Sequence, residues 1–246
     1  MMGRFLAPYT CVCDLAIICG NAMPDQSLTQ ETTDTEAASL RSPVLSRADW
    51  LRAALETLIE SGADAVKITR LADRLGVTRG SFYWHFKDRG EILEALIDSW
   101  AQKNTVAIVN AAGAGPDLTG SVLALMMAWL DAGLYDPRLD FSIRAWARSD
   151  AALRARVLET DETRLAALAQ MYQRAGRSPE AAEVAARNLY YMQMGYYALG
   201  VSEALATRLS YIRGYFTSFT GEALPEARLK RFLEEVAQRP GIKDAG

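Results

Sequence analysis

Apolar residues recur every three or four positions along most of this chain, which is the spacing of one face of an α-helix. The first such segment starts after Ser46, a residue type that caps helices, and ends before Gly62. Its apolar face is made of Trp50, Leu51, Ala54, Leu55, Leu58 and Ile59. The pattern therefore predicts a helix between Ser46 and Gly62, with Asp49 completing a capping box.

Two shorter apolar segments follow. From Ile68 to Gly76 the apolar positions repeat over only about two turns, with Thr69 as the candidate cap. Beyond Gly76, Thr78 is placed to cap a third helix in which Phe82 and Phe86 point to the same side. We therefore predict three short helices that share one small core.

A longer helix is predicted after Asp88, which is again a capping residue type. Its apolar face consists of Ile92, Leu93, Leu96, Ile97 and Trp100. The pattern continues to about Asn110 and is stopped by Gly113, Gly115 and Pro116. We expect this helix to leave the small core and enter the second half of the chain.

Beyond Pro116 the sequence predicts five or six further helices, separated by short segments that contain glycine or proline. The expected spans are 118–134, 137–148, 150–175, 178–199, 202–220 and 225–238. No segment has the eighteen or so uninterrupted apolar residues that a membrane helix requires, so we expect no membrane partner. The chain is thus predicted to be all-α, with about nine or ten helices in total.

We expect three regions along the chain. Residues 44–104 are predicted to form a three-helix N-terminal domain, and residues 105–246 a C-terminal helical bundle. From Asn21 to Pro43 the sequence is rich in Thr, Ser, Asp, Glu and Gln and has too few large apolar residues to form a core. Residues 1–43 are therefore interpreted as a disordered arm.

The start of the chain allows two interpretations. The apolar run from Phe5 to Cys19 faintly resembles a secretory signal, whereas a translation start at Met23 would make the upstream residues a start-site artefact. The second interpretation suits a cytoplasmic protein, and we favour it. The chain has three cysteines, Cys11, Cys13 and Cys19, which lack the further ligands that zinc needs. We expect no metal and no cofactor.

The charge of the chain is unevenly distributed. The whole sequence has a formal net charge of −3 at pH 7, and residues 1–43, with two basic and five acidic side chains, account for all of it. Residues 66–89 hold six basic and two acidic side chains, a local charge of +4. A local basic segment of this kind is typical of a nucleic-acid-binding surface, even where the whole chain is acidic.

Residues 68–86 have the form of a helix-turn-helix, the unit that places its second helix in the major groove of DNA. Gly76 provides the positive φ that the turn requires, and Val77 fills the angle between the two helices. Phe82 and Phe86 anchor the inner side of the second helix. The residues left on its outer side are Arg79, Ser81, Tyr83 and His85.

The run from Ile68 to Arg89, ITRLADRLGVTRGSFYWHFKDR, resembles the DNA-binding domain of the tetracycline-repressor (TetR) family. The features in register are Gly76-Val77, Tyr83-Trp84-His85-Phe86, and the basic Arg89 after a capping Asp88. The resemblance covers about residues 46–104, and the rest of the chain agrees in being helical and of suitable length. The family usually has Lys where Arg89 stands, which keeps the charge and changes its geometry.

The helix-turn-helix residues divide by expected role. Arg79 lies at the start of the second helix, where its guanidinium can donate two hydrogen bonds to a guanine edge; the alternative is a solvated surface arginine. Tyr83 and His85 lie further along the helix and are expected to contact phosphate or sugar. The full set of predicted DNA contacts is Thr69, Arg70, Thr78, Arg79, Gly80, Ser81, Tyr83, His85 and Arg89.

A single helix-turn-helix spans too few base pairs for useful specificity, so we expect a homodimer on a palindromic operator. The resemblance implies that two late helices form the dimer interface, and the candidates are 178–199 and 202–220. Their apolar residues fit intramolecular core packing equally well. The sequence leaves these two alternatives open.

The resemblance also implies a small-molecule cavity in the C-terminal half. Ligand binding in that cavity is expected to move the two DNA-binding domains of the dimer apart. The side chains that can line such a cavity are Met126, Met127, Trp129, Arg144, Trp146, Tyr190, Tyr191, Met194 and Tyr197. For any single apolar residue of this set we favour ordinary core packing, and for Arg144 we favour an exposed surface position.

The sequence therefore favours a cytoplasmic, homodimeric repressor that binds double-stranded DNA and is released by a small apolar or aromatic effector. A ligand-independent activator or an architectural DNA-binding protein is the alternative. A helical enzyme has almost no support, because the chain contains no HExxH, no phosphate loop and no GxSxG motif.

Overall fold

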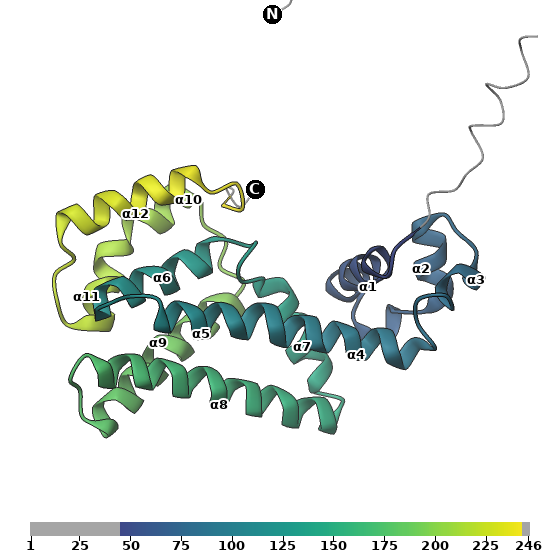
Figure 1. Cartoon of the computed structure of the whole chain (residues 1–246), viewed down its shortest axis with the longest axis horizontal. Coiled ribbons are helices and arrows are strands. Elements are labelled where there is room, and N and C mark those ends of the chain that lie inside the picture. Colours follow the sequence, from purple (N-terminus) through teal and green to yellow (C-terminus); the bar gives the residue numbers. More distant parts are fainter. Residues whose placement is uncertain (1–44, 243–246) are drawn as a thin grey trace, which may run out of the picture. The chain divides into compact units, whose positions relative to one another are not determined.

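The computed structural model describes residues 45–242. The arm predicted over residues 1–43, with its three cysteines, lies outside the described residues. Every regular element within 45–242 is a helix, in agreement with the all-α prediction (Figure 1). None of these helices is both long enough and apolar enough to span a membrane.

Three short helices open the described part of the chain. Their bounds are Arg47–Ser61 for α1, Ile68–Leu75 for α2 and Arg79–Phe82 for α3, with a 3-10 turn, η2, at Ala63–Ala65. The predicted capping box is present, because the Ser46 side chain accepts from the Asp49 N–H while the Asp49 carboxylate accepts from the Ser46 N–H at 2.9 Å. The sequence therefore determines where α1 begins.

Two predicted caps differ from the structure. Thr69 lies inside α2, whose cap is Lys67, since the Leu71 N–H already donates to the Lys67 carbonyl at 3.0 Å. Thr78 does occupy the cap position of α3, but its hydroxyl makes no cap bond. The Ser81 N–H, a donor that such a hydroxyl would bind, donates instead to the Thr78 carbonyl at 3.1 Å.

The long helix predicted from Asp88 is continuous but contains a π-helical turn. Its parts are α4 at Arg89–Trp100, the π-helical η3 at Ala101–Thr105 and α5 at Val106–Gly113. The Asp88 side chain caps it by accepting from the Glu91 N–H at 2.9 Å. The π turn buries Asn104, whose amide exchanges two hydrogen bonds, of 2.9 and 3.0 Å, with the backbone of Asp136.

Seven helices follow within the described residues. They are α6 at Leu118–Leu130, α7 at Pro137–Ala147, α8 at Ala151–Arg174, α9 at Pro179–Ala198, α10 at Leu205–Ser210, α11 at Ile212–Thr220 and α12 at Glu226–Gln238. The single helix predicted over 202–220 is wrong, because the chain leaves helical geometry at Tyr211, where ψ is −6°. The other predicted breaks agree with the structure to within a few residues.

The buried apolar residues form two clusters. The first joins α1 to α4 around Trp50, Phe82 and Trp100, and it also takes in Leu139 and Ile143 of α7. The second fills the space between α5, α6, α8, α9, α11 and α12. Because α7 packs on the first cluster, the N-terminal helices are fixed against the bundle through more than the α4–α5 helix.

Candidate nucleic-acid interface

The turn between α2 and α3 is set by a glycine. Gly76 has a φ of +66°, in the left-handed region where a Cβ is unfavourable. The next residue, Val77, donates its N–H to the Ala72 carbonyl at 3.0 Å and so closes the end of α2. The chain thus leaves α2 at a sharp angle and starts α3 at Arg79.

Aromatic packing holds α3 in place from beneath. The ring of Phe82 meets the edge of Trp50 at a centroid distance of 5.3 Å and stacks on Phe86 at 5.5 Å. The Arg47 guanidinium covers the other ring of this stack, 4.4 Å from the centroid of Phe86. Both phenylalanines are buried, as predicted, and they fix which side of α3 faces outward.

The outward side of α3 is polar and accessible, and we call it the α3 face. Its members are Thr78, Arg79 and Gly80, which are exposed, Ser81 and His85, which are half-buried, and Tyr83 and Trp84, which are exposed. Within residues 45–242, no hydrogen bond or ion pair holds the Arg79 side chain. Its guanidinium is therefore available to a partner molecule.

Trp84 is a member of this face that sequence reasoning did not select. Its side chain is 86% exposed, against 60% for Tyr83. The signal was present in the sequence, because residue 84 is two positions from each of the two anchors, Phe82 and Phe86. On a helical path that spacing points a side chain away from the core. An indole so placed offers an N–H donor and an apolar ring to whatever meets α3.

The basic residues around α3 divide into free and engaged side chains. Arg74 bridges Glu60 at 2.7 Å and Glu56 at 2.9 Å, and its hydrogen bond lowers the pKa of the Glu60 carboxyl. Arg89 donates from Nε and Nη2 to the carbonyls of Val66 and Ala63, each at 2.7 Å. Much of the predicted local charge of +4 is thus engaged inside the domain, and the phosphate contact of Arg89 stays a prediction.

Two other predicted contacts lie at the start of α2. Thr69 and Arg70 are both exposed, and the Arg70 guanidinium donates to the Ser61 hydroxyl at 2.8 Å. That single contact leaves most of the Arg70 donors open. The structure therefore brings the exposed contacts of α2 and α3 onto the same three-helix domain, on either side of the Gly76 turn.

Residues 51–96 match the family model described as bacterial regulatory proteins, tetR family. The chain is 41% identical over 54 residues to the tetracycline repressor protein class A from transposon 1721 of Escherichia coli, which is 22% of this chain and 25% of that protein. Residues 51–96 are thus a tetR-family segment. A second relative, the HTH-type transcriptional regulator TtgR of Pseudomonas putida, is 38% identical over 53 residues, again 22% of this chain and 25% of the relative. The matched segment therefore spans about a quarter of the length of either relative.

Solved structures extend the likeness of this chain to its fold. SCO4454, a TetR-family transcriptional regulator from Streptomyces coelicolor, aligns over 85% of this chain and 98% of its own with a TM-score of 0.52 and 20% identity. GusR from Salmonella enterica aligns over 79% of this chain and 98% of its own with a TM-score of 0.53 and 18% identity. The arrangement of an N-terminal helix-turn-helix and a C-terminal helical domain is thus the TetR fold.

The predicted effector residues do not share one cavity. Met126 and Trp129 line a cavity of about 60 Å³ together with side chains of α9 and α11. Trp146 packs against the first apolar cluster, whereas Met194 packs against the second and accepts the Tyr135 hydroxyl at 3.8 Å. The spacing of residues within single helices could not show how these side chains group, and their part in effector binding stays a prediction.

Arg144 and Tyr190 belong instead to a buried ion cluster, which we define as Trp100, Asp140, Arg144, Asp161, Arg164 and Tyr190. The Arg144 guanidinium donates a hydrogen bond to the Asp140 carboxylate at 2.6 Å. It also donates to both carboxylate oxygens of Asp161, at 2.6 and 2.8 Å. Asp140 is fully buried. The expectation of an exposed Arg144 is therefore wrong, because two carboxylates from α7 and α8 hold it.

Opposing effects act on the Asp140 carboxyl. Burial raises its pKa, but the charges of Arg164 and Arg144, with hydrogen bonds from Arg144 and Trp100, outweigh burial and hold the pKa below its ordinary value. Burial also raises the pKa of the Tyr190 hydroxyl, which donates to Asp161 at 2.7 Å. Asp140 is thus ionised and Tyr190 keeps its proton at neutral pH, and the cluster ties α4, α7, α8 and α9 together.

Proposed function

We propose that this chain is a transcriptional repressor that binds double-stranded DNA by inserting α3 into the major groove. The observation that carries the proposal is the α3 face, where polar side chains stand free above a buried aromatic stack. A side chain that has no partner in the protein, on a helix held by buried packing, needs little reorganisation to form a hydrogen bond with a base edge. Residues 44–104 are the DNA-binding domain in this proposal.

The residues of the interface have different tasks in the proposal. Arg79 bonds a base edge, because it lies at the first turn of α3 and no described residue engages it. Gly80 and Ser81 allow close approach to the groove. Thr69, Arg70, Thr78, Tyr83 and His85 contact phosphate or sugar and set the position of α3. Arg89 supports this geometry from within the domain through the carbonyls of Ala63 and Val66.

Homodimerisation through α9 to α11 is part of the proposal. Three alanines of α9, Ala182, Ala185 and Ala186, and the phenylalanines of α11 lie in the core of the protomer, so they are not the contact residues, whereas Ala181 is exposed. Large apolar side chains nevertheless remain exposed here, including Val184 at 53% and Tyr191 at 52% on α9 and Tyr211 at 49% between α10 and α11. Burying such residues against a second copy removes apolar surface from water and matches a palindromic operator.

Release by a small effector completes the proposed mechanism. The C-terminal region 105–246 offers the cavity beside Met126 and Trp129, where the buried Trp129 Nε1 has no hydrogen-bond acceptor among the described residues. A volume of about 60 Å³ is below that of typical ligand sites, so effector binding must widen the cavity. We propose that this movement lowers DNA affinity and that the protein acts in the cytoplasm.

Binding to the DNA upstream of its own gene tests the proposal. The logarithm of the association constant should fall with the logarithm of salt concentration, with a slope near −0.9 per phosphate neutralised. Arg79→Ala should reduce discrimination between the operator and a substituted operator by roughly tenfold, since one base contact is lost. Lys230→Ala, an exposed lysine on α12, is the control and should change neither value. A salt-independent affinity, or equal discrimination by Arg79→Ala and wild type, would contradict the proposal.

A further inference from the structure

A groove of about 590 Å³ lies between the α5, α6 and α12 helices, and we call it the α5–α12 groove. It is separate from the cavity beside Met126 and Trp129, since neither of these side chains lines it. Its walls are η3 and α5 on one side and α12 on the other, with α6 between them (Figure 1). The groove is therefore a candidate second binding site in the C-terminal half.

Small side chains create this groove. On α6, Gly120, Ala124 and Ala128 recur every four residues and so share one face. On the wall that faces them, Ala107, Ala111 and Ala114 have the same kind of spacing. The bottom of the groove is otherwise apolar, with Leu123, Met127 and Phe232. Space lined by methyl groups and larger apolar side chains favours an apolar occupant.

Part of this apolar lining is exposed to water. Val106 is 49% exposed and Leu134 is 38% exposed, and both lie at the end of the groove where α6 finishes. From Gln102 to Ala114 the η3–α5 wall advances by about 18 Å, at 1.5 Å per residue. A groove of this length accommodates an extended alkyl chain better than a compact ring system.

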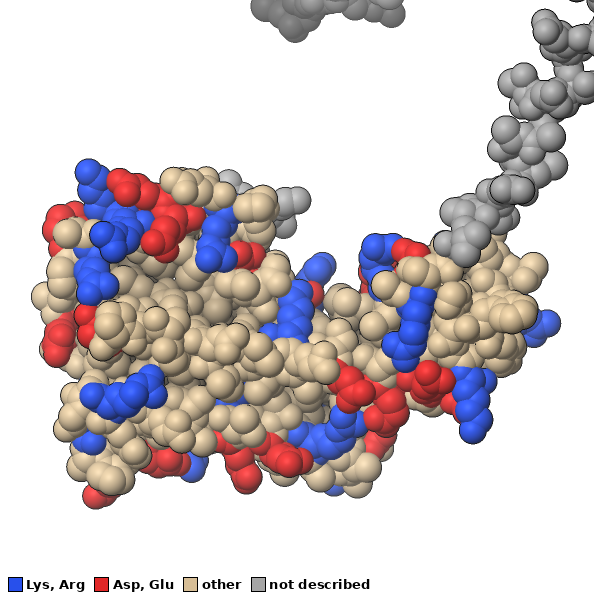
Figure 2. Space-filling view, viewed as in Figure 1, with Lys and Arg blue, Asp and Glu red and all other residues tan. Residues whose placement is uncertain are grey.

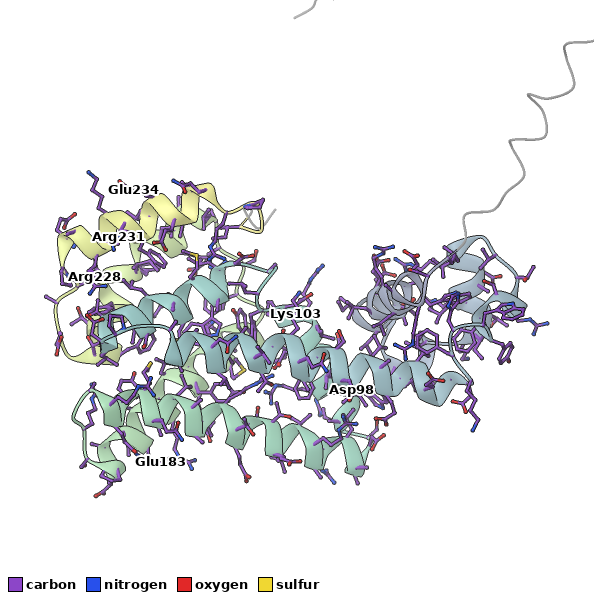
Figure 3. The ribbon with its side chains drawn as sticks, in the orientation of Figure 1. Asp98, Lys103, Glu183, Arg228, Arg231 and Glu234 are labelled. Atoms are coloured by element: carbon purple, nitrogen blue, oxygen red, sulfur yellow. The ribbon has the colours of Figure 1, made fainter. Side chains whose placement is uncertain are left out.

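The rim of the groove is basic. Its charged residues are Lys103, Arg228, Arg231, Glu235 and Arg239 (Figure 3 labels three of them). Figure 2 shows Lys and Arg side chains over α12 on this side of the molecule, interleaved with acidic ones. The balance at the rim itself is four positive charges against one negative.

Two of these cations are already neutralised and two are not. Arg228 pairs with Asp117 at 2.8 Å, and Arg239 with Asp131 at 3.0 Å. The Lys103 Nζ donates only to the Ala132 carbonyl, at 3.0 Å, and no carboxylate of the described chain pairs with it. Arg231 is exposed and makes no side-chain bond to any residue between 45 and 242. The unpaired cations therefore favour a negatively charged occupant.

We propose that the α5–α12 groove binds an amphipathic carboxylate with an unbranched alkyl chain. Its carboxylate meets Lys103, which lies one helical turn from the exposed Val106, and its chain extends over the small residues of α5 and α6. Arg231 on the opposite wall adds a second positive charge near the chain's path. The ligand is thus defined by one negative charge at the end of an apolar chain.

Dodecanoate is the probe for this proposal, with dodecanol as its uncharged counterpart. By isothermal titration at low salt, dodecanoate should bind with one site per chain and at least tenfold more tightly than dodecanol, because only the acid engages Lys103. Affinity should rise about fourfold for each methylene added from octanoate to dodecanoate, as expected for burial of an alkyl chain. Equal binding of the acid and the alcohol would overturn the proposal.

Matched variants locate the site. Val106→Asp places a negative charge in the groove and should weaken dodecanoate binding at least tenfold. Val109→Asp, at a valine that is 37% exposed on the same helix but does not line the groove, should not. Lys103→Ala should weaken binding about tenfold, while Lys230→Ala, at an exposed lysine of α12 that does not line the groove, should leave it unchanged.

Two outcomes of these titrations would contradict the proposal. One is a similar response of Val106→Asp and Val109→Asp, and the other is binding at several equivalent sites in every variant. Circular dichroism shows whether each variant is folded, so a folding defect is not mistaken for a lost site. The titrations contain no DNA, so their result is independent of the repressor proposal.

Discussion

The α3 face and the buried ion cluster use similar side chains in opposite ways. On the α3 face, Arg79 has no partner among the described residues and Trp84 is 86% exposed. In the cluster, Arg164 is fully buried, bonds Asp140 at 3.0 Å and lies 5.2 Å from the ring of Trp100. The comparison shows that an arginine becomes available for recognition only where its own chain supplies no carboxylate.

The difference follows from which helices surround each group. α3 is a single turn whose aromatic anchors lie beneath it, so nothing of the described chain covers its outer side. The cluster lies where α4, α7, α8 and α9 meet, and side chains of all four helices reach it. Substitutions on the α3 face should therefore alter binding, whereas substitutions in the cluster should alter stability.

Asp140→Ala is expected to have the largest effect on stability. It leaves Arg164 buried without its nearest charge and removes the acceptor of the Trp100 N–H, which lies at 2.6 Å. Breaking a buried pair from one side costs about 3–5 kcal/mol of unfolding free energy, measurable by urea denaturation. Glu183→Ala is the matched control, because it breaks an exposed pair with Arg187 and should cost less than about 1 kcal/mol. Similar losses of unfolding free energy in the two variants would show that the buried ion cluster stabilises the protein no more than an exposed ion pair does.

The pH dependence of unfolding tests whether the charge of Asp140 stabilises the buried ion cluster. The folded pKa of Asp140 is lowered, so its stabilisation is complete above the unfolded value of about 3.9 and is lost as pH falls through the folded pKa. Below about pH 4 the unfolding free energy of the wild type should therefore fall more steeply than that of Asp140→Asn, by up to about 1.4 kcal/mol per pH unit. Parallel curves for the two proteins would show that Asp140 gains no stabilisation from its charge.

The N-terminal domain could be predicted from sequence because its signals are local. A capping box at Ser46, a glycine at position 76 and two phenylalanines four residues apart act within one or two turns, and the structure contains all three features. The same local view overestimated the free charge, because Arg74 pairs with Glu56 and Glu60 of another helix. Contacts between helices are not encoded in the spacing of one segment.

In the C-terminal half the helices could be predicted from sequence, whereas the grouping of side chains into sites could not. Its breaks at glycine and proline are local, whereas the grouping of side chains depends on how α6 to α12 pack. Arg144 shows the consequence, since its carboxylate partners are 4 and 17 positions away and only the first is visible as a helical pair. The α5–α12 groove is similar, because its small residues resemble ordinary packing positions until α12 is placed beside them.

Of the substitutions discussed in these two regions, Trp84→Ala should change the unfolding free energy least, and it should still weaken DNA binding. With 86% of its side chain exposed, truncation removes little packing, so the change in unfolding free energy should stay within about 0.5 kcal/mol. If α3 enters the major groove, the indole meets sugar or phosphate, and its loss should weaken binding to operator and substituted operator alike by roughly threefold to tenfold. Leu158→Ala, at a leucine that is 58% exposed on α8, is the control and should alter neither quantity. A loss of stability in Trp84→Ala comparable to that of Asp140→Ala would mean that the α3 face is part of the core after all, and the contrast between the two regions would fail.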